Sequence, residues 1–206
     1  LTLSTNDLQL TRGESIADTA KTLSRYVDAI MARVYDHETL EILSQHSSVP
    51  VINGLSNSYH PCQILADLMT IKEHKKKFKK IKVVWIGDGN NVCNSLILGC
   101  AKLKIKISIA TPNGFEPSTV VTSTAKLHTD IELTNDPMES INDADVVMTD
   151  TFVSIHNNET DRLKKFLPKF QVNNSLMQKA KKDAIFLHCL PAKRDQEVTS
   201  DVLDGP

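Results

Sequence analysis

The chain has 206 residues, of which 40% are hydrophobic, enough to bury the core of one large domain or two small ones. Its 24 basic and 25 acidic residues leave a formal net charge of −1, so no overall field points to a nucleic acid or an anionic membrane. No apolar stretch approaches the roughly twenty residues of a membrane span. The four cysteines lack paired close spacing, which indicates a reducing compartment rather than a zinc site or a disulfide framework.

The first part of the chain carries an incomplete pattern of strands and helices. Ser15 and Asp18 favour a capped helix that ends near Arg25. Apolar runs predict strands at 29–34 and 49–52, with a helix at 37–45 between them. Pro61 opens a further helix, which we expect to bridge two lobes. Its apolar positions are expected to share one face: Ile64, Leu65, Leu68 and Ile71.

From residue 81 onward, short apolar runs alternate with helical patterns. Strands are expected at 81–86, 105–110, 131–133, 146–149 and 184–187. Helices are expected at 92–103, 118–127, 137–141 and 175–180. This alternation predicts right-handed crossovers and a parallel sheet covered on both faces. We therefore expect an α/β fold of two lobes of parallel sheet flanked by helices: an incomplete domain at 1–71 and a larger domain at 72–206 that is truncated at its C-terminus.

Two loops that follow predicted strands carry reactive side chains. Asp88-Gly89-Asn90-Asn91 follows the strand at 81–86, and His188-Cys189-Leu190-Pro191 follows the strand at 184–187. Ligands of open α/β sheets bind beyond the carboxyl ends of the strands, so we expect both loops to face one crevice. Neutral amides in one loop, and a thiol beside an imidazole in the other, suit a small polar substrate and proton or acyl-type chemistry.

Three further motifs lie at predicted boundaries. Arg33 ends a strand, and a guanidinium there suits bidentate recognition of an anion, although a surface arginine is equally ordinary. His60-Pro61-Cys62-Gln63 opens a helix, so His60 and Gln63 can face one anion near the helix N-terminus. Thr149-Asp150-Thr151 ends another strand, where an aspartate is often only a cap.

Taken in order, these five motifs resemble the aspartate/ornithine carbamoyltransferase family, and most closely the ornithine carbamoyltransferases. The resemblance covers essentially the whole chain. It implies transfer of a carbamoyl group from carbamoyl phosphate to the side-chain amine of L-ornithine, which gives citrulline and phosphate. It also implies no cofactor, no metal, no nucleic-acid or membrane partner, and a homotrimer. We expect a cytoplasmic location, or the mitochondrial matrix if a leader precedes Leu1.

The resemblance implies that carbamoyl phosphate contacts Arg33, His60, Gln63 and Leu190. In the family, the arginine that matches Arg33 is catalytic and holds the carbamoyl oxygen and the phosphate. The residues that match His60 and Gln63 bind the carbamoyl group. The backbone carbonyl at Leu190, aimed by the turn at Pro191, faces the carbamoyl nitrogen.

The resemblance implies that ornithine contacts Asn91, Asp150, Ser154, Ile155 and Cys189. Asn91, rather than Asn90, matches the amide that binds the α-carboxylate. Asp150 contacts the amino groups of the acceptor, Ser154 helps to position them, and both Asp150 and Cys189 are expected to be catalytic. A thiolate at Cys189 could help to take a proton from the side-chain amine, whereas the ordinary interpretation of a free cysteine is a buried, inert thiol.

The chain departs from the family pattern in three ways. It contains no Ser-x-Arg-Thr phosphate-binding segment, and the family's C-terminal arginine segment is absent after Pro206. We therefore expect a fragment of a longer enzyme that is inactive by itself. The acceptor loop of the family reads Asp-x-Trp-x-Ser-Met-Gly, whereas this chain has Ile155-His156 at the last two positions, and a histidine in place of glycine can alter the loop geometry.

A nicotinamide-dependent dehydrogenase is one alternative, because Gly87-x-Gly89 follows a strand. However, Cys93 stands near the position of the third glycine, and the strand at 105–110 ends in Thr111-Pro112 without an acidic group for the ribose.

An aspartate carbamoyltransferase, or one with another acceptor, would share the His-Pro-x-Gln element. Asp88-Gly89-Asn90-Asn91 and His188-Cys189 favour ornithine.

A non-catalytic amino-acid-binding relative is also consistent with the missing phosphate loop and with Ile155-His156. An upstream Ser-x-Arg-Thr segment in the full reading frame would favour the enzyme.

Overall fold

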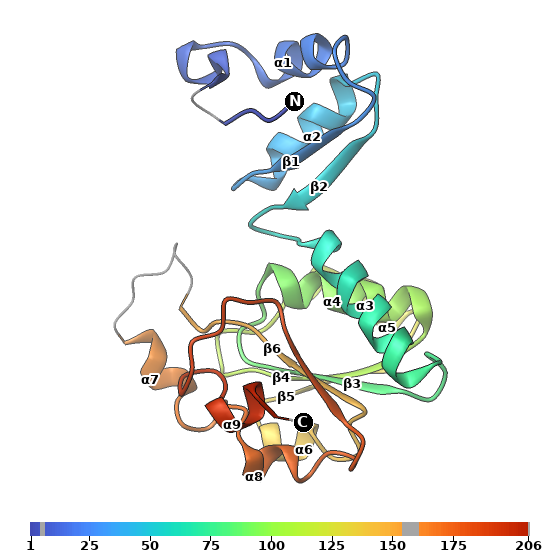
Figure 1. Ribbon diagram of the computed structural model, residues 1–206, viewed down its shortest axis with the longest axis vertical. Helices are drawn as coiled ribbons and strands as arrows, with labels where there is room; N and C mark the ends of the chain where they lie inside the picture. Colours follow the sequence, from blue (N-terminus) through green and yellow to red (C-terminus); the bar gives the residue numbers. More distant parts are fainter. Residues whose placement is uncertain (5–6, 154–160, 206) are drawn as a thin grey trace. The chain divides into compact units, whose positions relative to one another are not determined.

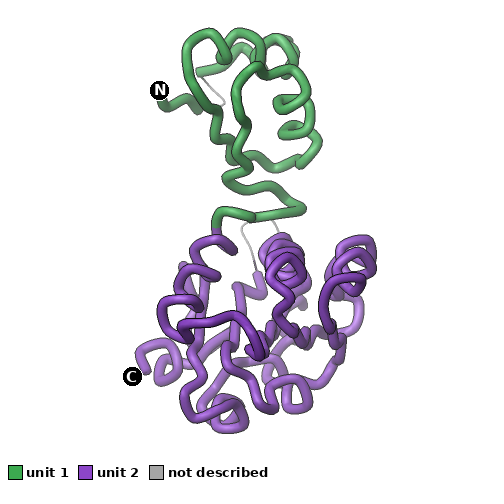
Figure 2. The backbone as a smooth tube through the Cα atoms, turned by 90° about the vertical axis from the view of Figure 1, so that its right-hand side faces the viewer, with its two compact units in different colours: residues 1–62 green, residues 63–206 purple. Residues whose placement is uncertain are grey.

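A computed structural model gives the structure of the chain and describes residues 1–4, 7–153 and 161–205. The chain divides into two compact units, Leu1–Cys62 (unit 1) and Gln63–Pro206 (unit 2) (Figure 2). Within the described residues, the strands form a two-stranded parallel sheet in unit 1 and a five-stranded parallel sheet in unit 2.

Unit 1 is the incomplete α/β part that the sequence predicts. Its elements are η2 (Gln9–Arg12), α1 (Ile16–Leu23), β1 (Ile30–Arg33), α2 (His37–His46) and β2 (Val51–Leu55). Ser15 caps α1, because its side chain accepts a hydrogen bond from the backbone N–H of Asp18. The second strand begins at Val51 rather than at 49, since Pro50 has no N–H to donate to a neighbouring strand.

Unit 2 alternates strands and helices as expected. Its elements are α3 (Pro61–Lys75), β3 (Lys82–Ile86), α4 (Asn91–Leu103), β4 (Lys106–Ala110), α5 (Thr119–Lys126), β5 (Ile131–Thr134), α6 (Pro137–Ser140), β6 (Val146–Thr149), α7 (Arg162–Phe166), α8 (Asn174–Met177), β7 (Ile185–His188) and α9 (Ser200–Leu203). The strands predicted at 81–86 and 184–187 lie in the same sheet, which confirms the α/β fold. The short helices α7 and α9 were not predicted.

Helix α3 differs from the prediction in one residue. Ile64, Leu68 and Ile71 are buried, but Leu65 is 68% exposed and does not belong to their face. Positions 64, 68 and 71 lie above one another on a helix, whereas a residue one position along is rotated by about 100°. The buried face includes Asp67 instead. Neither α3 nor any other helix in the described ranges is long and apolar enough to cross a membrane.

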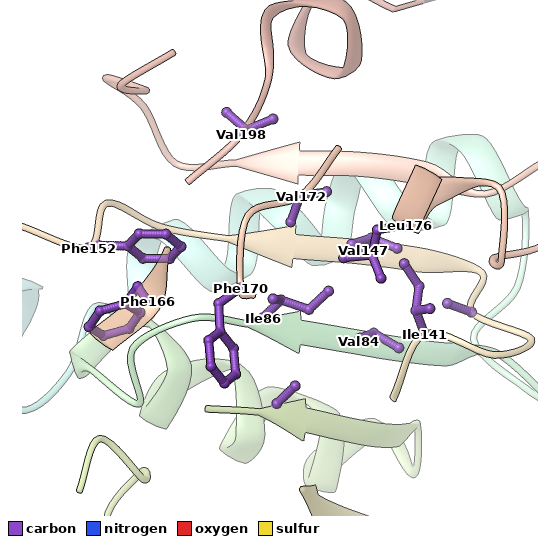
Figure 3. Close-up of a cluster of buried hydrophobic side chains, with 12 residues drawn as sticks. Val84, Ile86, Ile141, Val147, Phe152, Phe166, Phe170, Val172, Leu176 and Val198 are labelled. Atoms are coloured by element: carbon purple, nitrogen blue, oxygen red, sulfur yellow. The ribbon is translucent and has the colours of Figure 1, made fainter. Parts of the chain in front are cut away.

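The core of unit 2 lies on both faces of its sheet. In Figure 1, α3, α4 and α5 lie on one side of the strands, and α6, α8 and α9 lie on the other. Figure 3 shows one apolar cluster, in which side chains of β3 and β6 pack against Phe152 and Phe166. The rings of these two phenylalanines stack, with their centroids 4.5 Å apart. Neighbouring residues along β3, Val83 and Trp85, are also fully buried, because successive side chains of a strand point to opposite faces.

The strand order β5-β4-β3-β6-β7 places a topological switch point between β3 and β6. The chain moves outward from β3 through β4 to β5, then returns to the other side of β3. The hydroxyl of Thr149, the last residue of β6, donates to the carbonyl of Ile86, the last residue of β3, at 2.6 Å. The loops after β3 and β6 therefore start side by side, at the position where open α/β sheets bind ligands.

Candidate active site

Asp150 joins three strand-end loops. It follows β6, the strand that lies between β3 and β7. The amide nitrogen of Asn90, after β3, donates to Asp150 Oδ2 at 2.7 Å, and the thiol of Cys189, after β7, donates to Asp150 Oδ1 at 3.1 Å. The backbone N–H of Thr151 adds a bond of 2.7 Å to Oδ1. Asp150 is 8% exposed, so its carboxylate is an almost buried acceptor at the centre of the loops.

Asn90 and Asn91 have different surroundings. The side-chain oxygen of Asn90 caps α4 by accepting the N–H groups of Val92 and Cys93, while its nitrogen holds Asp150. Asn91 is half-buried at the first position of α4, and its side-chain oxygen accepts the N–H of Val92 at 3.0 Å. Sequence reasoning missed the bond from Asn90 to Asp150. An asparagine directly before a helix was the available signal for the cap.

The glycines of the loop after β3 are explained by close packing. A Cβ atom on Gly89 would lie 2.2 Å from the backbone nitrogen of Pro117, so only glycine fits against the segment after β4. Gly87 has a φ of +133°, which L residues rarely adopt, and lies against the ring of Phe152. These contacts account for the Gly-x-Gly spacing without a bound dinucleotide.

Arg162 forms a buried ion pair with Asp88. Its guanidinium also donates through Nε to the carbonyl of Phe152 at 2.5 Å and lies 4.6 Å from the ring centroid of Phe115. Burial raises the pKa of Asp88 to about 6, against the opposing effect of Arg162. The pair ties the loop after β3 to the segment that follows Asp150. Sequence reasoning missed Arg162, because an arginine on a short helix reads as an ordinary surface residue.

The surroundings of Cys189 favour the protonated thiol. Burial raises the pKa of Cys189 far above its ordinary value, and the negative charge of Asp150 raises it further. The desolvated and negative surroundings disfavour the thiolate considered from the sequence, and the thiol donates a hydrogen bond to Asp150.

Hydrogen bonds to both ring nitrogens hold the imidazole of His188 in place. The backbone N–H of Leu190 donates to His188 Nδ1 at 2.8 Å, and His188 Nε2 lies 3.2 Å from Glu197 Oε1. Leu190 has a φ of +54° and is followed by a cis bond to Pro191. The imidazole thus supports the turn on either side of Cys189.

One group has the chemistry of metal ligands. Asp150, His188 and Cys189 offer ligand atoms that all lie within 4.8 Å of one another. However, both ring nitrogens of His188 are already hydrogen-bonded, and the thiol of Cys189 carries its proton. Metal ligation requires a free imidazole nitrogen, whereas hydrogen bonds occupy both ring nitrogens of His188 in this structure.

The remaining predicted residues lie in different parts of the chain. Gln63, in unit 2, donates from its amide nitrogen to Asp67 Oδ1 at 3.0 Å. Arg33 and His60 belong to unit 1, where Arg33 is exposed at the end of β1 and His60 is half-buried. Arg33 also borders a cavity of about 240 Å³, but the walls of this cavity are mostly apolar, which is unsuited to phosphate.

Two predicted acceptor contacts, Ser154 and Ile155, lie outside the described residues, as does His156. Within unit 2, the structure brings Asn90, Asp150 and Cys189 into direct contact.

Known proteins share both the sequence and the fold of this chain. The profile of the aspartate/ornithine carbamoyltransferase Asp/Orn binding domain matches residues 79–206, and that of the carbamoyl-P binding domain matches residues 1–73. The chain belongs to the aspartate/ornithine carbamoyltransferase family. Membership of this family agrees with the resemblance seen in the five motifs and disfavours the dehydrogenase alternative.

Individual members of the family support the same assignment. The ornithine carbamoyltransferase of Cenarchaeum symbiosum is 60% identical over 200 residues, and that of Bacillus subtilis is 53% identical over 213 residues. They match 97% and 100% of this chain, and the chain spans 66% of each relative's length. The structure of ornithine carbamoyltransferase from Pyrococcus furiosus superposes with a TM-score of 0.92 at 51% identity, over 100% of this chain and 68% of that one.

Proposed function

We propose that the protein containing this chain is an ornithine carbamoyltransferase. The observation that carries the proposal is the contact of Asp150 with Asn90 and Cys189 at the switch point of a sheet, in a chain of this family. In the reaction, the side-chain amine of L-ornithine attacks the carbamoyl carbon. A C–N bond forms, the bond from carbon to the phosphate oxygen breaks, and the proton that the amine loses ends on phosphate.

The two parts of the chain have separate tasks in this proposal. Residues 1–71 form part of the carbamoyl phosphate domain and end in the bridging helix, and residues 72–206 form the ornithine domain. The two family profiles, at 1–73 and 79–206, support this division. Arg33, His60 and Gln63 bind carbamoyl phosphate, with the guanidinium of Arg33 on the carbamoyl oxygen and the phosphate, where negative charge develops.

Asp150 is the centre of the acceptor side. Its nearly buried carboxylate provides the negative charge that attracts the ammonium groups of ornithine, and the bonds from Asn90 and Cys189 hold it in place. Asn91 binds the α-carboxylate through its amide. The remaining assigned acceptor contacts are Ser154, Ile155 and Cys189.

The carbonyl of Leu190 accepts an N–H of the carbamoyl group. Its turn is supported by His188, which accepts the N–H of Leu190.

The proposal extends to a homotrimer that works in the cytoplasm, which the family resemblance supports.

Citrulline formation by the protein of the complete reading frame tests the proposal. We expect turnover with carbamoyl phosphate and L-ornithine, and none when L-aspartate replaces ornithine. Turnover with aspartate would instead indicate an aspartate carbamoyltransferase. Binding of ornithine by calorimetry without any turnover would favour a non-catalytic amino-acid-binding protein.

A further inference from the structure

Asp67 is a buried carboxylate one turn beyond Gln63 on α3. It is 6% exposed, on a helix face otherwise formed by Ile64, Leu68 and Ile71. The amide nitrogen of Gln63 donates to Asp67 Oδ1 at 3.0 Å, and Oδ2 has no hydrogen-bond partner among the described residues. Burying a carboxylate with one oxygen unsatisfied is unfavourable, and a leucine would suit this apolar face better. The unfavourable burial therefore calls for a functional reason.

The carboxylate determines which way the Gln63 amide points. A glutamine amide has two donors on nitrogen and an acceptor oxygen, and it can rotate to present either. An ionised carboxylate is only an acceptor, so Asp67 selects the orientation in which the nitrogen of Gln63 faces it. The oxygen of the half-buried Gln63 amide then points away from Asp67 and is left for a ligand.

Asp67 also lies close to the loop after β7. Its charge contributes to raising the pKa of Cys189 in that loop. Gln63 and Asp67 therefore belong to the same region as the turn at Leu190. A carbamoyl NH2 group has two N–H donors, and the oxygen of Gln63 and the carbonyl of Leu190 would supply one acceptor for each.

We propose that Asp67 is a positioning residue that locks the Gln63 amide with its oxygen toward the carbamoyl NH2 group, and so makes the site selective for carbamoyl phosphate over acyl phosphates. This role rests on the proposed carbamoyl transfer. Acetyl phosphate carries a methyl group where carbamoyl phosphate has NH2, so it leaves the oriented oxygen unpaired. Sites built around such a hydrogen bond reject analogues that lack it. Without Asp67 the amide rotates, and this discrimination weakens.

The test measures selectivity in the protein of the complete reading frame. The quantity is the ratio of the inhibition constant of acetyl phosphate to the KM of carbamoyl phosphate in citrulline formation. Asp67→Ala should lower this ratio by roughly tenfold, as expected for one lost hydrogen bond. Asp67→Asn has a donor as well as an acceptor, so it no longer selects one orientation of the Gln63 amide and should also lower the ratio. Asp145→Ala is the matched control, because Asp145 is equally buried but precedes β6 and pairs with Lys181, so the ratio should stay unchanged.

Two further variants separate positioning from folding. Asp67→Leu fills the space with an apolar side chain and should give the same loss even where Asp67→Ala folds poorly. Gln63→Ala should lower the ratio as well, and adding Asp67→Ala to it should cause no further loss, because both act through one amide. An unchanged ratio in the Asp67 variants, or additive losses in the double variant, would overturn the role of Asp67 while leaving carbamoyl transfer intact. Absence of citrulline formation by the wild-type protein would instead overturn the proposed function, and the role of Asp67 with it.

Discussion

Glu197 holds His188 in a single tautomer. The N–H of Leu190 can only donate, so His188 Nδ1 must accept it, and the ring proton of a neutral imidazole then lies on Nε2. That nitrogen donates to Glu197 Oε1 at 3.2 Å, and the two side chains are 1% and 0% exposed. Glu197 therefore acts through His188 on the turn that carries Cys189 and Leu190.

Replacement of Glu197 by alanine should destabilise unit 2. Glu197 Oε1 also accepts the backbone N–H of Lys193 at 2.6 Å, so the variant leaves two donors without a partner in a partly buried site. Each should lower the free energy of unfolding by about 1–3 kcal/mol. Glu197→Gln keeps an acceptor oxygen and should lose less. Urea unfolding measures both variants, and an unchanged midpoint for Glu197→Ala would contradict this account.

Arg162→Met should lower the free energy of unfolding by about 3–5 kcal/mol, because Asp88 is left as an uncompensated buried charge. The double variant with Asp88→Asn should recover part of this loss, because the unpaired negative charge of Asp88 is then removed as well. Lys164→Met is the matched control on the same helix: Lys164 is exposed and, among the described residues, its ion pair is with the exposed Asp161, so it should change stability by less than about 0.5 kcal/mol. Equal losses for Arg162→Met and Lys164→Met in denaturant unfolding would refute the buried ion pair.

Asp67 should make the protein less stable as pH rises. Burial raises the pKa of Asp67 from 3.8 to about 6, so the folded state binds the proton more tightly than the unfolded state. The contribution of Asp67 to the free energy of unfolding has its largest value below about pH 4. It decreases as the pH rises through about 6, because the carboxyl group of the folded state then loses its proton. Asp67→Asn should therefore raise stability near pH 8 by up to roughly 3 kcal/mol, with the gain vanishing near pH 4. Thermal or urea unfolding at the two pH values provides the measurement, and a gain of equal size at both would exclude this cause.

Asp150→Asn should remove ornithine binding while carbamoyl phosphate still binds, because the variant keeps the shape of the side chain and loses its charge. Calorimetry with each ligand in the protein of the complete reading frame measures the two effects separately. Asp145→Asn is the control: Asp145 and Asp150 flank the same strand, β6, and are both 8% exposed. Collapse of carbamoyl phosphate affinity in Asp150→Asn would mean that Asp150 is structural.

Arg33→Ala should weaken carbamoyl phosphate far more than ornithine. Loss of one partner from a buried charge pair with phosphate corresponds to roughly 2–5 kcal/mol of binding free energy. Titration of each ligand into the variant distinguishes this from a general effect, which would weaken both ligands equally.

The sequence alone determined the elements and the reactive positions. The alternation of apolar runs and helical patterns predicted all five strands of unit 2 to within two residues, because buried parallel strands and their crossover helices have distinct apolar patterns. Ser15 capped the helix that it was expected to start. The short helices α7 and α9 escaped prediction, since four or five residues show no helical period and neither helix has a side-chain cap, whereas the equally short α6 and α8 are capped by Asp136 and Asn173.

Tertiary structure alone decided which side chains meet. Strand order is set by long-range packing, and it placed β6 between β3 and β7, so that Asp150 came to bridge Asn90 and Cys189. The partnerships of Arg162 with Asp88 and of Glu197 with His188 have no local signal, because a buried and an exposed charged residue look alike in a sequence. Burial also affected Cys189: its desolvated position beside a carboxylate raises the pKa of this thiol further above the ordinary value, which the sequence alone does not show.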